Sequence, residues 1–170
     1  MAAAREDPRE VYRLALEDFD AALHRDPDDV NAPRNRGETC LAFGRAEDRA
    51  GGDSRPWFDQ ALAIGEDLVR RMPNDGEARR IFADAHSNLG LLDQQQKQDG
   101  RAHWEAAIAA YRQGAERGTP ECWFNLGVLL YVVGRPEEAI AAFESCARAD
   151  PRLAGSCRAQ IAEVRKSQKK

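Results

Sequence analysis

Several residue types are scarce in this 170-residue chain, and each shortage excludes a class of protein. Lysine occurs only four times and the net charge is −4, which argues against general binding to nucleic acid, because phosphates require a basic face. No apolar run approaches the roughly 20 residues that span a bilayer. The first ten residues also lack the apolar core of a signal peptide. We therefore expect a cytoplasmic protein that binds neither nucleic acid nor membrane.

Cysteine is also scarce and is not arranged for metal or disulfide chemistry. The four cysteines, Cys40, Cys122, Cys146 and Cys157, are scattered along the chain without a CxxC pair. A disulfide framework or a structural zinc site needs closer and more regular spacing. We expect reduced, buried thiols.

The usual signs of catalysis are missing from the sequence. The three histidines, His24, His86 and His103, are far apart, and no HExxH, GxSxG or phosphate-binding glycine loop occurs. Acidic pairs such as Glu137-Glu138 stand at expected helix starts, where they complement the helix dipole. The sequence predicts no enzyme, no metal site and no cofactor.

What the chain does contain is helical periodicity, most clearly between residues 121 and 151. Apolar residues recur there at spacings of three and four, as on one face of a helix. Gly134-Arg135-Pro136 interrupts the pattern, with glycine placed to end one helix and proline to begin the next. The stretch therefore predicts two helices joined by a short turn.

This helical pair resembles a tetratricopeptide repeat, a helix–turn–helix unit of 34 residues. Residues favoured at repeat positions 4, 7, 8, 11, 20, 24 and 32 are present as Trp123, Leu126, Gly127, Leu130, Ala139, Phe143 and Pro151. At position 27, Cys146 replaces the usual alanine. Small residues at positions 8 and 20 allow the two helix backbones to approach closely.

The signature recurs upstream with unequal spacing. The second helices of four units are marked by Ala15, Ala61, Ala107 and Ala139, at intervals of 46, 46 and 32 residues. The two long intervals exceed the 34-residue period by twelve residues each. In the first case we expect an inserted loop at 45–56, with any extra helical turn ending before Gly51-Gly52. In the second we expect lengthened helices around 91–104. Two registers stay open for the third unit, because His86–Gly90 could also occupy positions 4 to 8.

The resemblance implies an all-α fold, a right-handed α-solenoid of antiparallel helix hairpins with about three and a half units and a C-terminal capping helix. The predicted single solenoid covers residues 8–166, with flexible ends at 1–7 and 167–170. Its parts are a half-repeat at 8–27, a repeat at 30–73 containing the inserted loop, a lengthened repeat at 75–118, a regular repeat at 119–151 and the capping helix at 152–166. Gly65 replaces the aromatic at position 24, and Trp57 or Trp104 is expected to fill the resulting gap.

The resemblance also implies a function, since repeats of this kind bind other proteins on a concave face lined by the first helices. Positions 2, 5, 9 and 12 of successive units give the candidate binding residues Asn31, Arg34, Glu38 and Leu41; Glu77, Arg80, Asp84 and Ser87; and Glu121, Phe124, Val128 and Tyr131. The mixed charges suit an amphipathic helix or an extended peptide of a partner protein. The apolar third set is the strongest indication of a contact surface, unless another element of the chain covers it.

The sequence leaves two alternatives open. The N-terminal half-repeat or the Phe124/Tyr131 face could pair with a second copy of the chain, which would make the protein a self-associating module. Residues 77–92 also resemble long repeats found beside bacterial serine/threonine kinase domains. That resemblance implies a regulatory segment of a larger signalling enzyme.

Overall fold

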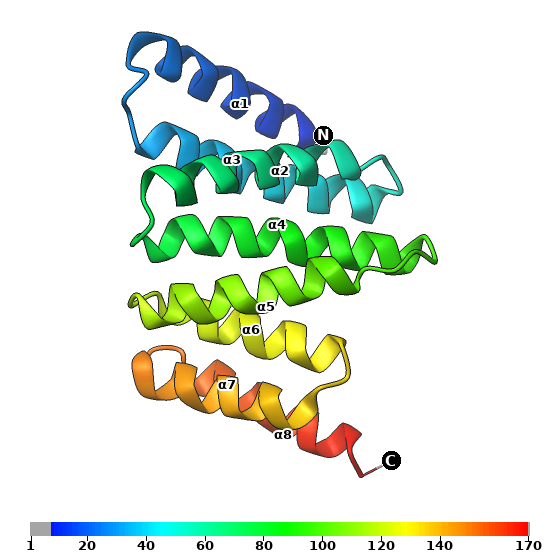
Figure 1. Cartoon of the computed structure of the whole chain (residues 1–170). Helices are drawn as coiled ribbons and strands as arrows, with labels where there is room; N and C mark the ends of the chain where they lie inside the picture. Colours follow the sequence, from blue (N-terminus) through cyan, green and yellow to red (C-terminus); the bar gives the residue numbers. More distant parts are fainter. Residues whose placement is uncertain (1–7, 170) are drawn as a thin grey trace, which may run out of the picture.

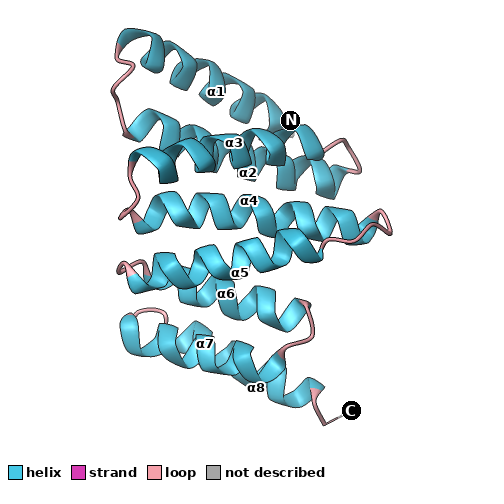
Figure 2. Cartoon of the chain, viewed as in Figure 1, coloured by secondary structure: helices cyan, strands magenta, loops and turns pink. Residues whose placement is uncertain are grey.

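The computed structural model describes residues 8–169, and within that range the chain forms eight helices and no strand (Figures 1 and 2). The helices are α1 (Pro8–Arg25), α2 (Asn31–Ala50), α3 (Arg55–Arg71), α4 (Gly76–Gln95), α5 (Arg101–Glu116), α6 (Pro120–Val132), α7 (Pro136–Ala149) and α8 (Ala154–Ser167). This confirms the predicted all-α class.

The helices stack in chain order into a right-handed solenoid, from α1 at one end to α8 at the other (Figure 1). Each helix packs against the next one in the chain, and in addition α2 contacts α4 and α4 contacts α6. We call α2, α4 and α6 the inner helices, and α1, α3, α5 and α7 the outer helices.

Short sequence signals set the ends of the helices. Gly51, Gly118 and Gly134 adopt positive φ values of 72°, 88° and 80°, a conformation that glycine adopts without steric cost. The carboxylate of Asp75 caps α4 by accepting hydrogen bonds from the amides of Glu77 at 2.8 Å and Ala78 at 3.3 Å. The ends of these helices are therefore set by local sequence and do not depend on packing between units.

The core consists of two clusters of buried apolar side chains that meet at α4. One cluster extends from Leu16 to Leu92 and the other from Ala83 to Val164. All four cysteine thiols are free and buried within these clusters, which confirms the expectation for them.

The inserted loop predicted at 45–56 is shorter than those bounds, because the extra helical turn expected before Gly51-Gly52 is present. Helix α2 continues to Ala50, and α3 begins at Arg55. The reason is that residues 45–50 contain good helix formers and no breaker, so the helix runs on until Gly51-Gly52. The extra residues of this unit therefore lengthen α2, and Arg45 lies within that helix.

The space beside Gly65 is filled by the backbone of α4, and not by Trp57 or Trp104 as expected. A Cβ atom at Gly65 would lie 2.7 Å from the Cα of Phe82, so α4 approaches α3 directly at this point. Trp57 instead stacks on Phe43, with ring centroids 4.1 Å apart, and Trp104 lies against Gly90.

The two predicted flexible ends fall partly outside the described range. Residues 1–7 and Lys170 lie outside the described residues. At the other end, Ser167 is the last residue of α8.

Candidate functional site

The inner surface of the solenoid is organised around the buried carboxylate of Asp84 on α4, which is 6% exposed. It accepts hydrogen bonds from the Tyr111 hydroxyl of α5 and from Asn125 Nδ2 of α6, the latter at 3.1 Å from Oδ1. Arg80 Nη1 lies 3.1 Å from its Oδ2. Burial raises the pKa of Asp84, and the donors from Tyr111 and Arg80 oppose that rise. The carboxylate therefore links α4, α5 and α6 through its polar contacts.

Arg80 extends this network to α2. Its Nε lies 2.8 Å from a carboxylate oxygen of Glu77, and its second terminal nitrogen pairs with Glu38. Burial opposes the charge of Arg80, but Asp84, Glu77 and Glu38 together hold its pKa above the ordinary value. Arg80 is thus a junction between α2 and α4.

Arg34 pairs with Asp75, the N-cap residue of α4. The structure therefore brings together Arg34, Glu38, Arg80 and Asp84 on the inner side, as their spacing predicts, but pairs them with neighbouring side chains. Their charges are largely used to hold α2 against α4.

Two adjoining cavities open beside this network, with volumes of about 320 and 220 Å³. Both are lined by Arg45, Arg80 and Asp84, and the larger also by Ser87 and Val128. The Arg45 side chain is 46% exposed, and its ion pair with Asp84 is long, at 3.9 Å between Nη2 and Oδ2. Because the pair is long and its Arg45 end is exposed, it holds this guanidinium only weakly and leaves it accessible to an incoming carboxylate.

The apolar part of the inner surface lies on α6. Val128, Tyr131 and Val132 are 40%, 39% and 45% exposed. Phe124, the other predicted aromatic, is half-buried because its ring packs edge-on against Phe143 at a centroid distance of 5.5 Å. The exposed apolar strip is therefore displaced along α6, from Phe124 toward Val132.

The remaining predicted residues are distributed along the same side. Ser87 lines the larger cavity. Asn31 is exposed at the first turn of α2, where its amide donates to Asp29 Oδ1 at 2.7 Å. Asn31 therefore lies at the end of the groove and away from the cavities.

Five residues that line the larger cavity were not predicted from the sequence, namely Arg45, Asn88, Tyr111, Asn125 and Leu129. Arg45 was assigned to a loop, although it stands seven residues after Glu38 and so shares its helix face once α2 is extended. Asn88 donates to the carbonyl of Asp84 at 2.6 Å. The spacing of four residues between Asp84 and Asn88 is a helical signal for this contact, whereas the reach of Tyr111 from α5 has no signal in the sequence.

Two histidines distant in sequence meet on the α4–α5 hairpin. The Nδ1 atoms of His86 and His103 lie 2.8 Å apart, and Asp93 Oδ2 is 3.8 Å from His103 Nε2. Across residues 8–169, no group of three or more His, Cys, Asp or Glu side chains is placed to hold a metal ion. In the same part of the chain, no helix combines the length and the apolar character needed to cross a membrane.

Solved structures similar to this chain are helical-repeat proteins. A thermophilic tetratricopeptide-repeat protein of Thermus thermophilus, TTC0263, is 20% identical with a TM-score of 0.66, over 92% of this chain and 74% of that one. MamA is 17% identical with a TM-score of 0.58, over 99% and 86%. The Yersinia enterocolitica type III secretion chaperone SycD is 13% identical with a TM-score of 0.51, over 77% and 93%. At these identities the likeness concerns the fold alone.

A family model identifies the repeats themselves. No curated protein sequence matches the chain significantly. The tetratricopeptide-repeat model, however, matches residues 9–67 and 89–154, which is more than half of the chain. Such repeats form protein–protein interaction scaffolds. By its sequence signature and its stacked hairpins, the chain belongs to the tetratricopeptide repeat family.

Proposed function

We propose that the chain is a non-enzymatic scaffold that binds a peptide or helix of a partner protein in the groove formed by α2, α4 and α6. The observation that carries this proposal is the 320 Å³ cavity that joins Arg45 to Val128. The partner segment presents a carboxylate to Arg45 and an apolar side chain to Val128, Tyr131 and Val132.

The internal ion pairs support this function indirectly. Because Arg80 is already paired with Glu38 and Asp84, these side chains of the groove floor are preorganised and lose little freedom on binding. The exposed Arg45 and the apolar strip are left to select the partner. Among the similar folds, the chaperone SycD is in complex with a peptide of the translocator YopD.

Site-specific cross-linking tests the location of the contact. A photoreactive residue at Val128 should capture a defined segment of a partner protein in living cells, whereas one at Ala141 on the outer helix α7 should not. Both side chains are exposed. Capture of the same segment at both positions would show that the inner groove is not the site.

Affinity measurements on the captured segment then test the chemistry. Arg45→Glu should weaken binding roughly tenfold or more, because a rejected carboxylate costs on the order of 1–3 kcal/mol. Arg148→Glu, a matched charge reversal on an exposed residue of α7, should leave the affinity unchanged. Equal effects of the two substitutions would contradict a specific role of Arg45.

A second candidate function is self-association through the α1 end of the stack. Val11 and Leu14 lie one turn apart on α1 and are 52% and 53% exposed. At the opposite end, α8 exposes polar side chains such as Arg158, Glu163 and Arg165. An apolar face of this kind can pair with a second copy.

Sedimentation over a range of concentrations tests the second candidate. We expect the mass to increase with concentration for the parent chain and to stay that of a monomer for Leu14→Glu. A monomeric parent at all concentrations would rule this candidate out while leaving the groove proposal intact.

A further inference from the structure

The outer side of the solenoid contains three equivalent grooves, each lying over an inner helix and between two outer helices. The residues that occupy equivalent places at the start of the inner helices are Pro33 in α2, Arg79 in α4 and Trp123 in α6. In the second groove, Arg79 spans the space and donates to Gln113 of α5 and, at 2.7 Å, to the carbonyl of Pro73. In the third groove, Trp123 lines the space between α5 and α7 and leaves a cavity of about 170 Å³.

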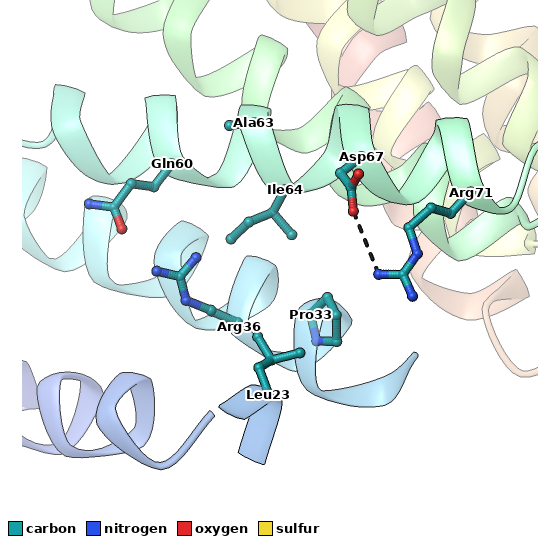
Figure 3. A pocket seen from close by; sticks show the side chains of 8 residues that line it. All are labelled: Leu23, Pro33, Arg36, Gln60, Ala63, Ile64, Asp67 and Arg71. Atoms are coloured by element: carbon teal, nitrogen blue, oxygen red, sulfur yellow. Dashed lines mark ion pairs between the residues drawn. The ribbon is translucent and has the colours of Figure 1, made fainter. Parts of the chain in front are cut away.

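At the equivalent place the first groove has only the short ring of Pro33, and the Arg36 side chain of the same helix extends over part of the space. Its cavity, between α1, α2 and α3, is about 350 Å³, twice that of the third groove. Leu23, Pro33 and Ile64 form an apolar floor, while Arg36, Asp67 and Arg71 stand around it (Figure 3).

The equivalence of the first and third grooves is fixed by residue spacing. Pro33 and Arg36 line the first groove as Trp123 and Leu126 line the third, three residues apart in each case. Residues 60, 63, 64 and 67 of α3 correspond in the same way to residues 138, 141, 142 and 145 of α7. The short ring of Pro33 therefore stands where an indole stands in the third groove.

We propose that this pocket receives a tryptophan side chain from a partner protein. The equivalent place in the third groove is occupied by the indole of Trp123. The volume also lies within the range of small-ligand sites, about 300–1,000 Å³. A buried indole is a common anchor of protein interfaces.

Charge complementarity supports an aromatic occupant. The Arg36 side chain reaches across the pocket toward α3 (Figure 3), and it is held by an ion pair of 2.8 Å between its Nε and Asp20 Oδ1. A positively charged guanidinium attracts the negative face of an aromatic ring. Asp67 is already paired with Arg70 and Arg71. This surface lies on the outer side and does not depend on the proposed function of the inner groove.

Nuclear magnetic resonance titration with N-acetyl-tryptophanamide, which mimics a tryptophan within a chain, tests the proposal. We expect saturable shifts of the amides of Arg36, Ala63 and Ile64, with a dissociation constant on the order of 1 mM for this single residue. N-acetyl-alaninamide should cause none. Arg36→Met should weaken binding about threefold through loss of the cation–π contact.

A matched pair of substitutions controls the location. Ala63→Trp places an indole over the first pocket and should abolish the shifts, whereas Ala141→Trp, its equivalent in the third groove, should preserve them. Both alanines are exposed, and circular dichroism verifies that both variants remain folded. The proposal is overturned by absent shifts, by shifts that persist in Ala63→Trp, or by binding of free indole without binding of N-acetyl-tryptophanamide. The last outcome would indicate a small-molecule site that cannot accept a ring attached to a chain.

Discussion

At the scale of single residues, the buried carboxylate of Asp84 shows how polar contacts position the inner helices. Its donors come from α4, α5 and α6, so it restricts the relative movement of two successive hairpins. A buried carboxylate is costly unless its lone pairs are satisfied. Asp84 is therefore expected to be sensitive to the loss of any one donor.

Tyr111→Phe tests this sensitivity without changing the shape of the core. The loss of the hydroxyl leaves one lone pair of Asp84 unsatisfied and should lower the free energy of unfolding by about 1–3 kcal/mol. Urea denaturation measures the change. Tyr131→Phe removes a hydroxyl from an exposed side chain and should change stability by less than about 0.5 kcal/mol. Similar effects of both substitutions would contradict the role assigned to Asp84.

The His86–His103 pair predicts a pH dependence of stability. Burial first, and the neighbouring His103 second, lower the pKa of His86 to about 4, against about 6.5 in an unfolded chain. Between these values the unfolded state binds a proton that the folded state does not. The free energy of unfolding should therefore decrease as the pH falls from 6.5 toward 4, by on the order of 2 kcal/mol.

Denaturation of His86→Gln across the same pH range isolates this contribution. The variant should show a shallower loss of stability below pH 6.5, since its side chain does not titrate. His24→Gln, a control at an exposed position, should follow the parent chain. If His86→Gln and the parent have the same slope, another group is responsible.

At the scale of the helices, α3 and α4 can approach closely because α3 has a glycine, Gly65, at the point of contact. Gly65 lacks the Cβ that would meet the α4 backbone at 2.7 Å. A closer approach is possible only where one partner is glycine. The same helix position in the C-terminal unit carries Phe143, which shows that the repeat tolerates two different ways of filling this space.

Gly65→Ala should therefore destabilise the chain, although alanine favours helix by about 1 kcal/mol. We expect a net loss of about 1–3 kcal/mol, because the new methyl group meets backbone that cannot move away easily. Gly155→Ala in α8 meets no atom within 4 Å and should leave the stability unchanged or raise it by up to about 1 kcal/mol. Thermal unfolding of the two variants gives the comparison, and stabilisation by Gly65→Ala would refute the close contact.

At the scale of the whole molecule, the two buried clusters predict uneven unfolding. They share only α4 as a common element, and in a solenoid each unit contacts only its neighbours. Phe143, which is 1% exposed, belongs to the C-terminal cluster alone. Damage to one cluster should therefore spread little to the other.

Phe143→Ala should cost about 3–5 kcal/mol, and hydrogen exchange should locate that loss. We expect amide protection to fall in α5–α8 while α2 and α3 retain most of theirs. An equal loss of protection in all helices would show instead that the solenoid unfolds as one cooperative unit.

The sequence alone determined the repeat class and the side of the solenoid on which its charged residues lie. Both follow from local rules: helical periodicity, turn residues and the fixed spacing of small and aromatic positions act within one hairpin. Residues such as Arg80 and Asp84 could be placed on one face because a helix has a known period. The end of α2 before Gly51-Gly52 also follows from a local signal, whereas the length of helix gained from the surplus residues does not.

Only the tertiary structure decided which of these residues remain available to a partner. Arg34 and Arg80 are occupied by Asp75, Glu38 and Asp84, whereas Arg45 is left exposed, and neither fact follows from any single helix. The unfilled pocket beside Pro33 likewise depends on three helices at once. Contacts between units are set by the distance and angle at which hairpins stack, and a sequence pattern confined to one hairpin contains no measure of either.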